Sequence, residues 1–400
     1  MARKSKTDEE NRFPPELLER PREEWLKYFI GYAVAHPVLA DAFNDLLDEI
    51  IDRTGKPLIL VMGPPGAGKT FLYEAVRAEI RDRWSRKQLD DRGRIPVVGI
   101  EVPAKKRIKP TWSTVYKRLL EDMEEPLIDK KIKYGEITIR ADSNGKLIIP
   151  KADTDTLCYA LEQALKHRNP YAVFLDEAPH LSEMAGLSDQ DQMDCIKSLA
   201  SLSKSILVLF GTYEMLDLLD LSDQLMRRSS VIHLRRYGFT KRDKEIFRNT
   251  LHSFQVNMPF PTEPNLIQHA DYFHERTAGC IGILYEWLVK AYTLALKDPN
   301  ASTLPEECIE KACPLSERRA EKMNDNIKKD EERLKKEVGG EDTYFKDRRR
   351  NANKNNGKGG VAKKGNKSPV GQGRTTKPFN RKPVRDQTGI RRDDEAVVNQ

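Results

Sequence analysis

The 400-residue chain has few cysteines and no long hydrophobic run. Its five cysteines are scattered, with no CxxC pair among them, which argues against a zinc site or a disulfide framework. The longest apolar stretches, such as 58–62 and 172–175, are far shorter than the roughly 20 residues that a membrane-spanning helix needs. The first residues are charged and lack the apolar segment of a signal peptide. We therefore expect a cytoplasmic protein that makes no use of a membrane.

Charge is distributed unevenly along the chain. Residues 346–400 contain 16 Lys and Arg against 5 Asp and Glu, a local net charge of +11, whereas the whole chain carries +7. The preceding 345 residues are therefore mildly acidic, at −4. A basic tail on such a body favours a polyanion or an acidic partner, with an inert solubilising tail as the alternative. Because the tail is rich in Gly, Asn, Lys and Arg, we expect it to be disordered.

Strand and helix patterns alternate from about residue 25 to residue 240. Short, wholly apolar runs are typical of strands buried on both faces of a parallel sheet, and segments of helical periodicity separate them. The predicted strands are 58–62, 97–102, 172–176 and 206–210, and the predicted helices are 25–51, 71–86, 111–123, 155–166 and 192–202. An insertion at 130–150 carries the hairpin signal Asn144-Gly145. This alternation predicts a doubly wound α/β fold.

Beyond residue 240 only helical patterns remain, at 241–254, 266–277 and 281–296, and a charged helical stretch follows at 322–336. We therefore expect four parts. They are an N-terminal arm (1–24), an α/β domain with the hairpin insertion (25–240), a small helical lid domain (241–320), and a charged helix with the basic tail (321–400).

A complete phosphate-binding motif follows the first predicted strand. The segment Gly63-Pro64-Pro65-Gly66-Ala67-Gly68-Lys69-Thr70 satisfies GxxxxGK[ST] and precedes a helix that begins at Phe71. In this motif the glycines let backbone N–H groups face phosphate oxygens, the lysine reaches the β and γ phosphates, and the threonine ligates Mg²⁺. A chance glycine-rich turn is the alternative. We expect residues 63–71 to bind ATP together with Mg²⁺.

Two adjacent carboxylates end the third predicted strand. Asp176 is expected to hold Mg²⁺ through water, and Glu177 to polarise the attacking water as general base. Capping of the next helix is the alternative for this acidic pair. It is less favoured because Asp176 follows Thr70 by 106 residues, in the order that a P-loop ATPase requires.

Three further polar residues are candidates for the same chemistry. Thr212 follows the strand 206–210 and is a candidate sensor of the γ-phosphate, or else a turn threonine whose hydroxyl is satisfied locally. Arg227 and Arg228 are candidates for insertion into a neighbouring subunit's site, or else for surface solubility. The last long helix opens with Gly279-Cys280-Ile281-Gly282, where many AAA+ proteins present an arginine; here Arg276 is the nearest.

Together these segments resemble the TnsC/TniB family, AAA+ ATPases that regulate DNA transposition. The resemblance covers roughly residues 25–300. It rests on the P-loop, the Val102-Pro103 and Phe210-Gly211-Thr212 strand ends, the Ala35-His36-Pro37 lead-in, the run Asp176-Glu177-Ala178-Pro179-His180-Leu181, and the segment from Gln224 to Leu234. It implies an AAA+ P-loop NTPase with a parallel sheet, a helical lid and ATP-dependent assembly.

The resemblance also implies partners. They are duplex DNA, further copies of the chain in a ring or filament, transposase subunits, and a target-selection protein of the TniQ/TnsD type. By analogy, the stretch after the second strand should face DNA, and here it contains Lys105, Lys106, Arg107, Lys109 and Thr111. Cations there would engage phosphates without reading sequence. A solvated loop is the alternative.

Two other classes of function share these motifs. An initiator or a clamp or helicase loader usually adds a dedicated DNA-binding domain after the lid, whereas this sequence passes into a low-complexity tail. A signalling ATPase without a DNA partner is the other class. A translocating helicase needs a second motor lobe, whose motifs are not visible in the sequence.

Overall fold

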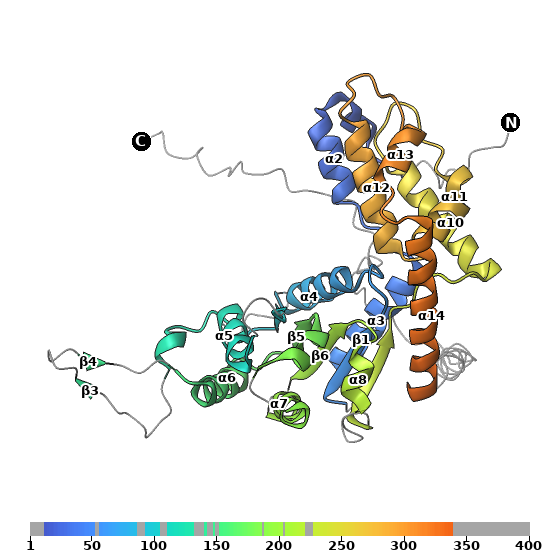
Figure 1. Cartoon of the computed structure of the whole chain (residues 1–400). Coiled ribbons are helices and arrows are strands. Elements are labelled where there is room, and N and C mark those ends of the chain that lie inside the picture. Colours follow the sequence, from blue (N-terminus) through green and yellow to red (C-terminus); the bar gives the residue numbers. More distant parts are fainter. Residues whose placement is uncertain are drawn as a thin grey trace, which may run out of the picture.

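The computed structural model describes residues 12–52, 56–85, 93–104, 110–131, 140–141, 147–148, 152–185, 188–202, 205–220 and 227–338. A helical domain stands over one end of an α/β domain, and one long helix, α14 (Glu317–Val338), runs from the first to the second (Figure 1).

Five parallel strands form the sheet of the α/β domain, in the order β2-β5-β6-β1-β7. They are β1 (Leu58–Met62), β2 (Val97–Glu101), β5 (Ala172–Asp176), β6 (Ile206–Gly211) and β7 (Ser229–His233). All residues of β1, β5 and β6 are buried, as expected for central strands with helices on both faces. The four predicted strands are confirmed. The edge strand β7 was not predicted, because its polar residues interrupt the apolar run that marks a buried strand.

Helices cover both faces of this sheet. They are α3 (Pro37–Asp52), α4 (Lys69–Ser85), α5 (Trp112–Asp122), α6 (Thr154–Arg168), α7 (Asp189–Leu202) and α8 (Met215–Asp220). Ile59 and Val61 of β1 pack in one core with α3 and α4, whereas Leu58 and Leu60 pack in a second core with α5, α6 and α7. The alternation of side chains along a strand produces this division.

The predicted insertion contains an antiparallel hairpin of β3 (Arg140–Ala141) and β4 (Leu147–Ile148). The predicted turn at Asn144-Gly145 lies outside the described residues. Short 3₁₀ helices complete the α/β part, at η2 (Ile128–Lys130) and η3 (Ala178–Glu183).

The single helix predicted over 25–51 is wrong. The chain forms η1 (Pro15–Glu19), α2 (Arg22–Ile30) and then α3, because Gly31 ends α2 and Pro37 can only begin a helix. The α2 helix does not cover the sheet but packs against α12 (Ile281–Ala295) of the helical domain. There the Phe29 ring lies 5.2 Å from the Tyr292 ring, edge to face.

The helical domain contains α10 (Lys241–Val256), η4 (Ile267–His269), α11 (Ala270–Arg276), α12 and α13 (Glu306–Ala312). Trp287 of α12 is buried at its centre, 4.6 Å from the Phe273 ring, and its indole N–H donates to the Ile309 carbonyl. None of the helices in the described ranges combines the length and the apolar character needed to cross a membrane.

Candidate nucleotide-binding site

The predicted nucleotide residues meet at one edge of the sheet. The P-loop follows β1, Asp176 ends β5, and Thr212 follows β6, which lies between these two strands. The Gly63 N–H donates to the Gly211 carbonyl at 3.3 Å, which ties the start of the loop to the end of β6. Parallel strands bring their carboxyl ends to the same edge, and this is where ligands of open α/β sheets bind.

The P-loop backbone is shaped by its glycines. Gly66 and Gly68 have φ of +73° and +98°, a region that other residues rarely adopt. A Cβ on Gly68 would meet nothing within 4 Å, so the loop faces open space there. Lys69 begins α4 directly behind the loop, so the positive end of that helix faces the same space. Anions fit this cradle.

Lys69 lies at the floor of the loop and is only 8% exposed. Its Nζ donates to the carbonyls of Gly63 at 3.0 Å and Pro64 at 2.9 Å. Burial lowers the pKa of this amine, and the carboxylates of Glu177 and Asp176 partly oppose that change. A polyphosphate would supply the negative charge that keeps a buried ammonium ionised.

Thr70 and Asp176, the two residues predicted to bind metal, are in contact. The Thr70 hydroxyl donates to Asp176 Oδ2 at 3.1 Å, and Asp176 Oδ1 accepts from the Glu177 N–H at 2.9 Å. Burial raises the pKa of the Asp176 carboxyl. A hydroxyl beside a carboxylate is the oxygen set that Mg²⁺ takes when phosphates and water complete its shell, so these residues fit the ion.

Glu177 has a strained backbone. Its φ of 53° and ψ of 42° lie in the left-handed region, where a residue other than glycine is uncommon. Such conformations persist only when the surrounding structure enforces them, and they gather at functional sites. Here η3 starts immediately afterwards and its residues Ala178 and Leu181 are fully buried, which fixes the turn at the end of β5.

The Thr212 hydroxyl is buried and has no hydrogen-bond partner among the described residues. A turn threonine satisfied by its own loop, the alternative for this residue, therefore does not fit. A buried hydroxyl without a hydrogen-bond partner costs roughly 1–3 kcal/mol. Its position beside the P-loop therefore favours a ligand whose oxygen accepts this hydrogen bond.

Arg227 and Arg228 do not join the site. Both side chains are exposed, immediately before β7. Ser229 pairs with Leu58, at the start of β1, whereas the P-loop follows Met62 at the other end of that strand. The two arginines therefore lie at the edge of the sheet opposite the phosphate-binding loop of their own chain.

Of the predicted DNA-facing residues, Lys105, Lys106, Arg107 and Lys109 lie outside the described part of the chain. Thr111 is exposed and precedes α5 without capping it through its side chain. Phe71, predicted beside the nucleotide, is 41% exposed on the first turn of α4.

Sequence patterns did not reveal how the lid meets the P-loop. The Gly282 N–H, at the start of α12, donates to the Gly66 carbonyl at 2.8 Å. A Cβ on Gly282 would lie 2.5 Å from that oxygen, so only glycine permits this approach. Arg276, the nearest arginine, instead pairs with Glu317 at the start of α14, at 3.4 Å. The spacing Gly279-x-x-Gly282 was the only signal in the sequence.

One family model matches part of the chain. A family described as an AAA domain matches residues 52–219. Among solved structures, the Aeropyrum pernix ORC2 protein in ADPNP–ADP complexes is 13% identical, with 71% of this chain and 68% of that chain covered and a TM-score of 0.48.

Two further structures are similar at the same level. The Aeropyrum pernix ORC1 protein in complex with DNA is 16% identical, with 68% and 63% covered and a TM-score of 0.46. A Walker-type ATPase from Pyrococcus abyssi is 16% identical, with 78% and 76% covered and a TM-score of 0.39. No curated protein sequence matches the chain. The chain therefore contains an AAA+ domain, built on a five-stranded parallel sheet with a complete P-loop at its ligand-binding edge.

Proposed function

We propose that this protein is an ATP-dependent regulator of DNA transposition that assembles with copies of itself on duplex DNA. The observation that carries the assembly is the position of Arg227 and Arg228, exposed at the edge of the sheet opposite their own P-loop. Only a second copy can bring them to a phosphate site, where an arginine offsets the charge of the transition state.

The hydrolytic chemistry follows from the residues at the sheet edge. The P-loop amides and Lys69 would bind the β and γ phosphates. Thr70 and Asp176 would hold Mg²⁺, which supplies charge neutralisation across those phosphates. Glu177 would orient and deprotonate the attacking water, and Thr212 would donate its free hydroxyl to the terminal phosphate.

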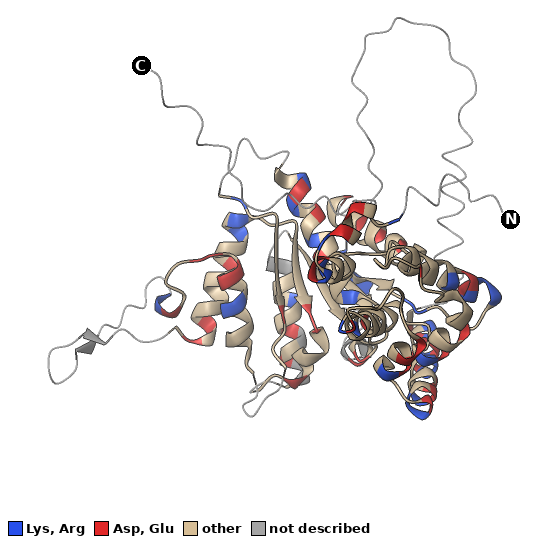
Figure 2. Ribbon diagram, turned by 90° about the horizontal axis from the view of Figure 1, so that it is seen from above, with Lys and Arg blue, Asp and Glu red and all other residues tan. Residues whose placement is uncertain are grey.

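Support for DNA and transposition as the setting comes from the sequence. The cationic segment 105–109 lies between β2 and α5 in the sequence. Of the segments that resemble the transposition family, 176–181 begins at the last residue of β5, and 224–234 includes β7. Figure 2 shows acidic and basic residues interspersed over the helices of both domains. We propose that the segment 105–109 and the basic tail hold the phosphate backbone, while a transposase and a target-selection protein bind the assembled form.

Electron microscopy tests the assembly. The purified protein is imaged on duplex DNA with ATP, with ADP and with a non-hydrolysable ATP analogue. We expect rings or filaments on DNA with ATP and the analogue only. Lys69→Ala should form none, whereas Glu177→Gln should form them with ATP and fail to release phosphate.

The outcomes separate the candidate functions. Absence of DNA-bound assemblies in every nucleotide state would contradict the proposal and favour a signalling ATPase. Assembly confined to one DNA sequence, without binding of transposase subunits, would favour an initiator or loader. Normal hydrolysis by Glu177→Gln would remove this residue from the role of general base.

A further inference from the structure

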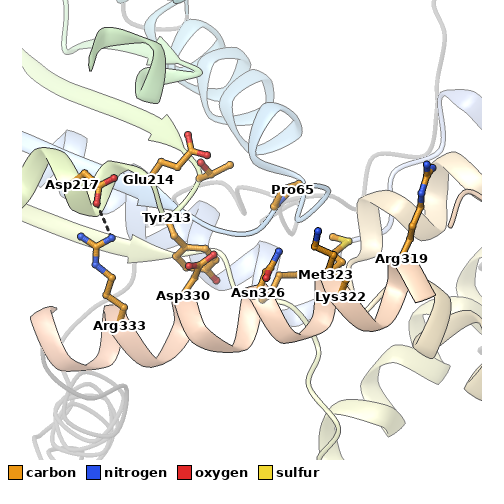
Figure 3. Close-up of a pocket in the computed structure, with 12 residues that line it drawn as sticks. Pro65, Tyr213, Glu214, Asp217, Arg319, Lys322, Met323, Asn326, Asp330 and Arg333 are labelled. Atoms are coloured by element: carbon orange, nitrogen blue, oxygen red, sulfur yellow. Dashed lines mark ion pairs between the residues drawn. The ribbon is translucent and has the colours of Figure 1, made fainter. Parts of the chain in front are cut away.

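A cavity of about 410 Å³ separates the P-loop from α14. Pro65 and Thr212 line it on the side of the sheet. Arg319, Lys322 and Asn326 line it on the side of α14 (Figure 3). Because Gly63 is bonded to Gly211, Thr212 is held beside the first residue of the P-loop. The cavity therefore adjoins the place where a terminal phosphate would lie.

The α14 helix is fixed in this position by apolar and ionic contacts. Ile327 and Leu334 are 3% and 5% exposed and pack into the core shared with α7 and β6. Arg236, just after β7, pairs with both carboxylate oxygens of Glu331, at 3.2 and 3.3 Å. The face of α14 that looks into the cavity is thus set by the fold.

The cations on that face differ in pairing from one end of the helix to the other. At the end near Pro65 are two exposed cations, Arg319 and Lys322, and neither forms an ion pair with another described side chain. At the other end, Arg333 is held by Asp217 at 2.7 Å. Figure 3 shows Lys322 directed toward the loop that bears Pro65. The unpaired positive charge thus lies at the P-loop end of the cavity.

Among the described residues of the helical domain, none with a cationic side chain is seen to bond the P-loop. Gly282 touches the Gly66 carbonyl with its backbone, and no side chain fits between them. Arg276 is turned toward Glu317. The described cations that line the cavity all belong to α14.

We propose that Arg319 and Lys322 of α14 bind the terminal phosphate of a nucleoside triphosphate held in the P-loop of the same chain. This rests on the proposed nucleotide binding. The buried Thr212 hydroxyl completes the same phosphate from the opposite wall. Lys and Arg bind phosphate through charge-assisted hydrogen bonds. A nucleoside diphosphate has no terminal phosphate at this position to form them. The α14 helix therefore distinguishes a triphosphate from a diphosphate.

The test is the affinity of the full-length protein for a non-hydrolysable ATP analogue and for ADP, measured by calorimetry with Mg²⁺. Arg319→Ala and Lys322→Ala should each weaken binding of the analogue by roughly tenfold and leave the affinity for ADP unchanged. Both side chains are exposed, so neither change should alter the melting temperature. Lys322→Arg keeps the positive charge and should bind the analogue with the affinity of the parent.

Lys328→Ala is the matched control. At 100° per residue, Lys328 lies on the face of α14 opposite Arg319 and is exposed. It should bind both nucleotides like the parent. Unchanged affinity for the analogue in Arg319→Ala and Lys322→Ala would overturn the proposal. So would an equal loss of affinity for ADP in these two variants, or an equal loss of affinity for the analogue in Lys328→Ala.

The two proposals fail in different ways. Retained affinity for the analogue in Lys69→Ala would overturn nucleotide binding at the P-loop, and with it the role of α14. A loss confined to the analogue in the α14 variants supports this inference even if the parent forms no assembly on DNA.

Discussion

His36 is a buried residue whose protonation opposes folding. The residue is 5% exposed. Its Nδ1 lies 2.9 Å from the Tyr237 hydroxyl and accepts from the Leu39 N–H at 3.4 Å. Burial, helped by the nearby Arg235 charge, lowers its pKa from 6.5 to about 4. The lead-in segment is thus joined to the end of the sheet through a neutral imidazole.

This pKa predicts a loss of stability in mild acid. Between pH 6.5 and 4 the unfolded chain binds a proton that native His36 does not, so the free energy of unfolding should fall as the pH falls through this window, by roughly 3 kcal/mol in all. Urea unfolding at pH 7 and pH 5 measures the slope.

His36→Gln provides the comparison. Its amide can still bond the Tyr237 hydroxyl but does not titrate, so its stability should depend less on pH than that of the parent. His274, whose pKa burial also lowers, is present in both proteins and cancels in the difference. Equal slopes would show that the pKa of His36 is the same in the folded and the unfolded protein, and would contradict the prediction.

Motifs were enough to group the chemistry-bearing residues. Lys69, Thr70 and Asp176 were expected together; they lie at one edge of the sheet, where Thr70 bonds Asp176, and their roles toward nucleotide and metal stay predictions. Arg227 and Arg228 were expected at a neighbour's site, and their roles stay predictions. What sequence could not supply was the free hydroxyl of Thr212, because hydrogen-bond satisfaction depends on which groups surround it.

At the scale of elements, the contact between α12 and the P-loop joins the two domains through their backbones. Gly282→Ala would place a Cβ 2.5 Å from the Gly66 carbonyl oxygen. An alanine in a helix is usually favoured over glycine by up to about 1 kcal/mol. Here we expect the opposite sign, a destabilisation of about 1–3 kcal/mol, because backbone must move to relieve the overlap.

Urea unfolding and nucleotide affinity measure this effect together. Glu286→Ala is the control, since that residue is exposed on the same helix. It should change stability little, and nucleotide affinity not at all. Gly282→Ala with the stability and affinity of the parent would mean that the lid does not touch the P-loop in solution.

Elements were predictable where they were apolar or strongly periodic. The strands 58–62 and 172–176 were located to the residue, because every position in them is buried. The edge strand β7 was missed because three of its five residues are serine or histidine. The division between α2 and α3 was missed because both helices carry apolar residues at helical spacing on either side of the break.

At the scale of the whole molecule, Arg236 joins three parts of the chain. Its guanidinium bonds Glu331 and Asn324 of α14 and the Ala278 carbonyl before α12, and its side chain is 5% exposed. Arg236→Met should lower the free energy of unfolding by about 3 kcal/mol, because it leaves buried acceptors without a donor.

Arg333→Ala is the matched change on the same helix. Its ion pair with Asp217 is exposed, with side chains 38% and 68% accessible, so the loss should be under about 1 kcal/mol. Urea unfolding compares the two variants. A similar loss for both would mean that Arg236 is not the main tie between α14 and the rest of the chain.

The sequence indicated a charged helix near residues 322–336 but not its position. Only Ala320, Ile327 and Leu334 are buried in α14, at intervals of seven residues among charged ones. That pattern predicts one narrow apolar stripe and leaves the surface it contacts undefined. Arg236 and the core around Tyr213 define that surface, and both come from segments more than 80 residues earlier.

The α14 helix is attached at both ends, by Glu317 to Arg276 of the helical domain and by Arg333 to Asp217 of the α/β domain. With 22 residues at 1.5 Å each, it is a rod of about 33 Å. A rod fixed at two points acts as a strut: the lid cannot rotate over the P-loop without bending it or breaking one attachment. The strut therefore couples the position of the lid to that of the α/β domain that carries the P-loop.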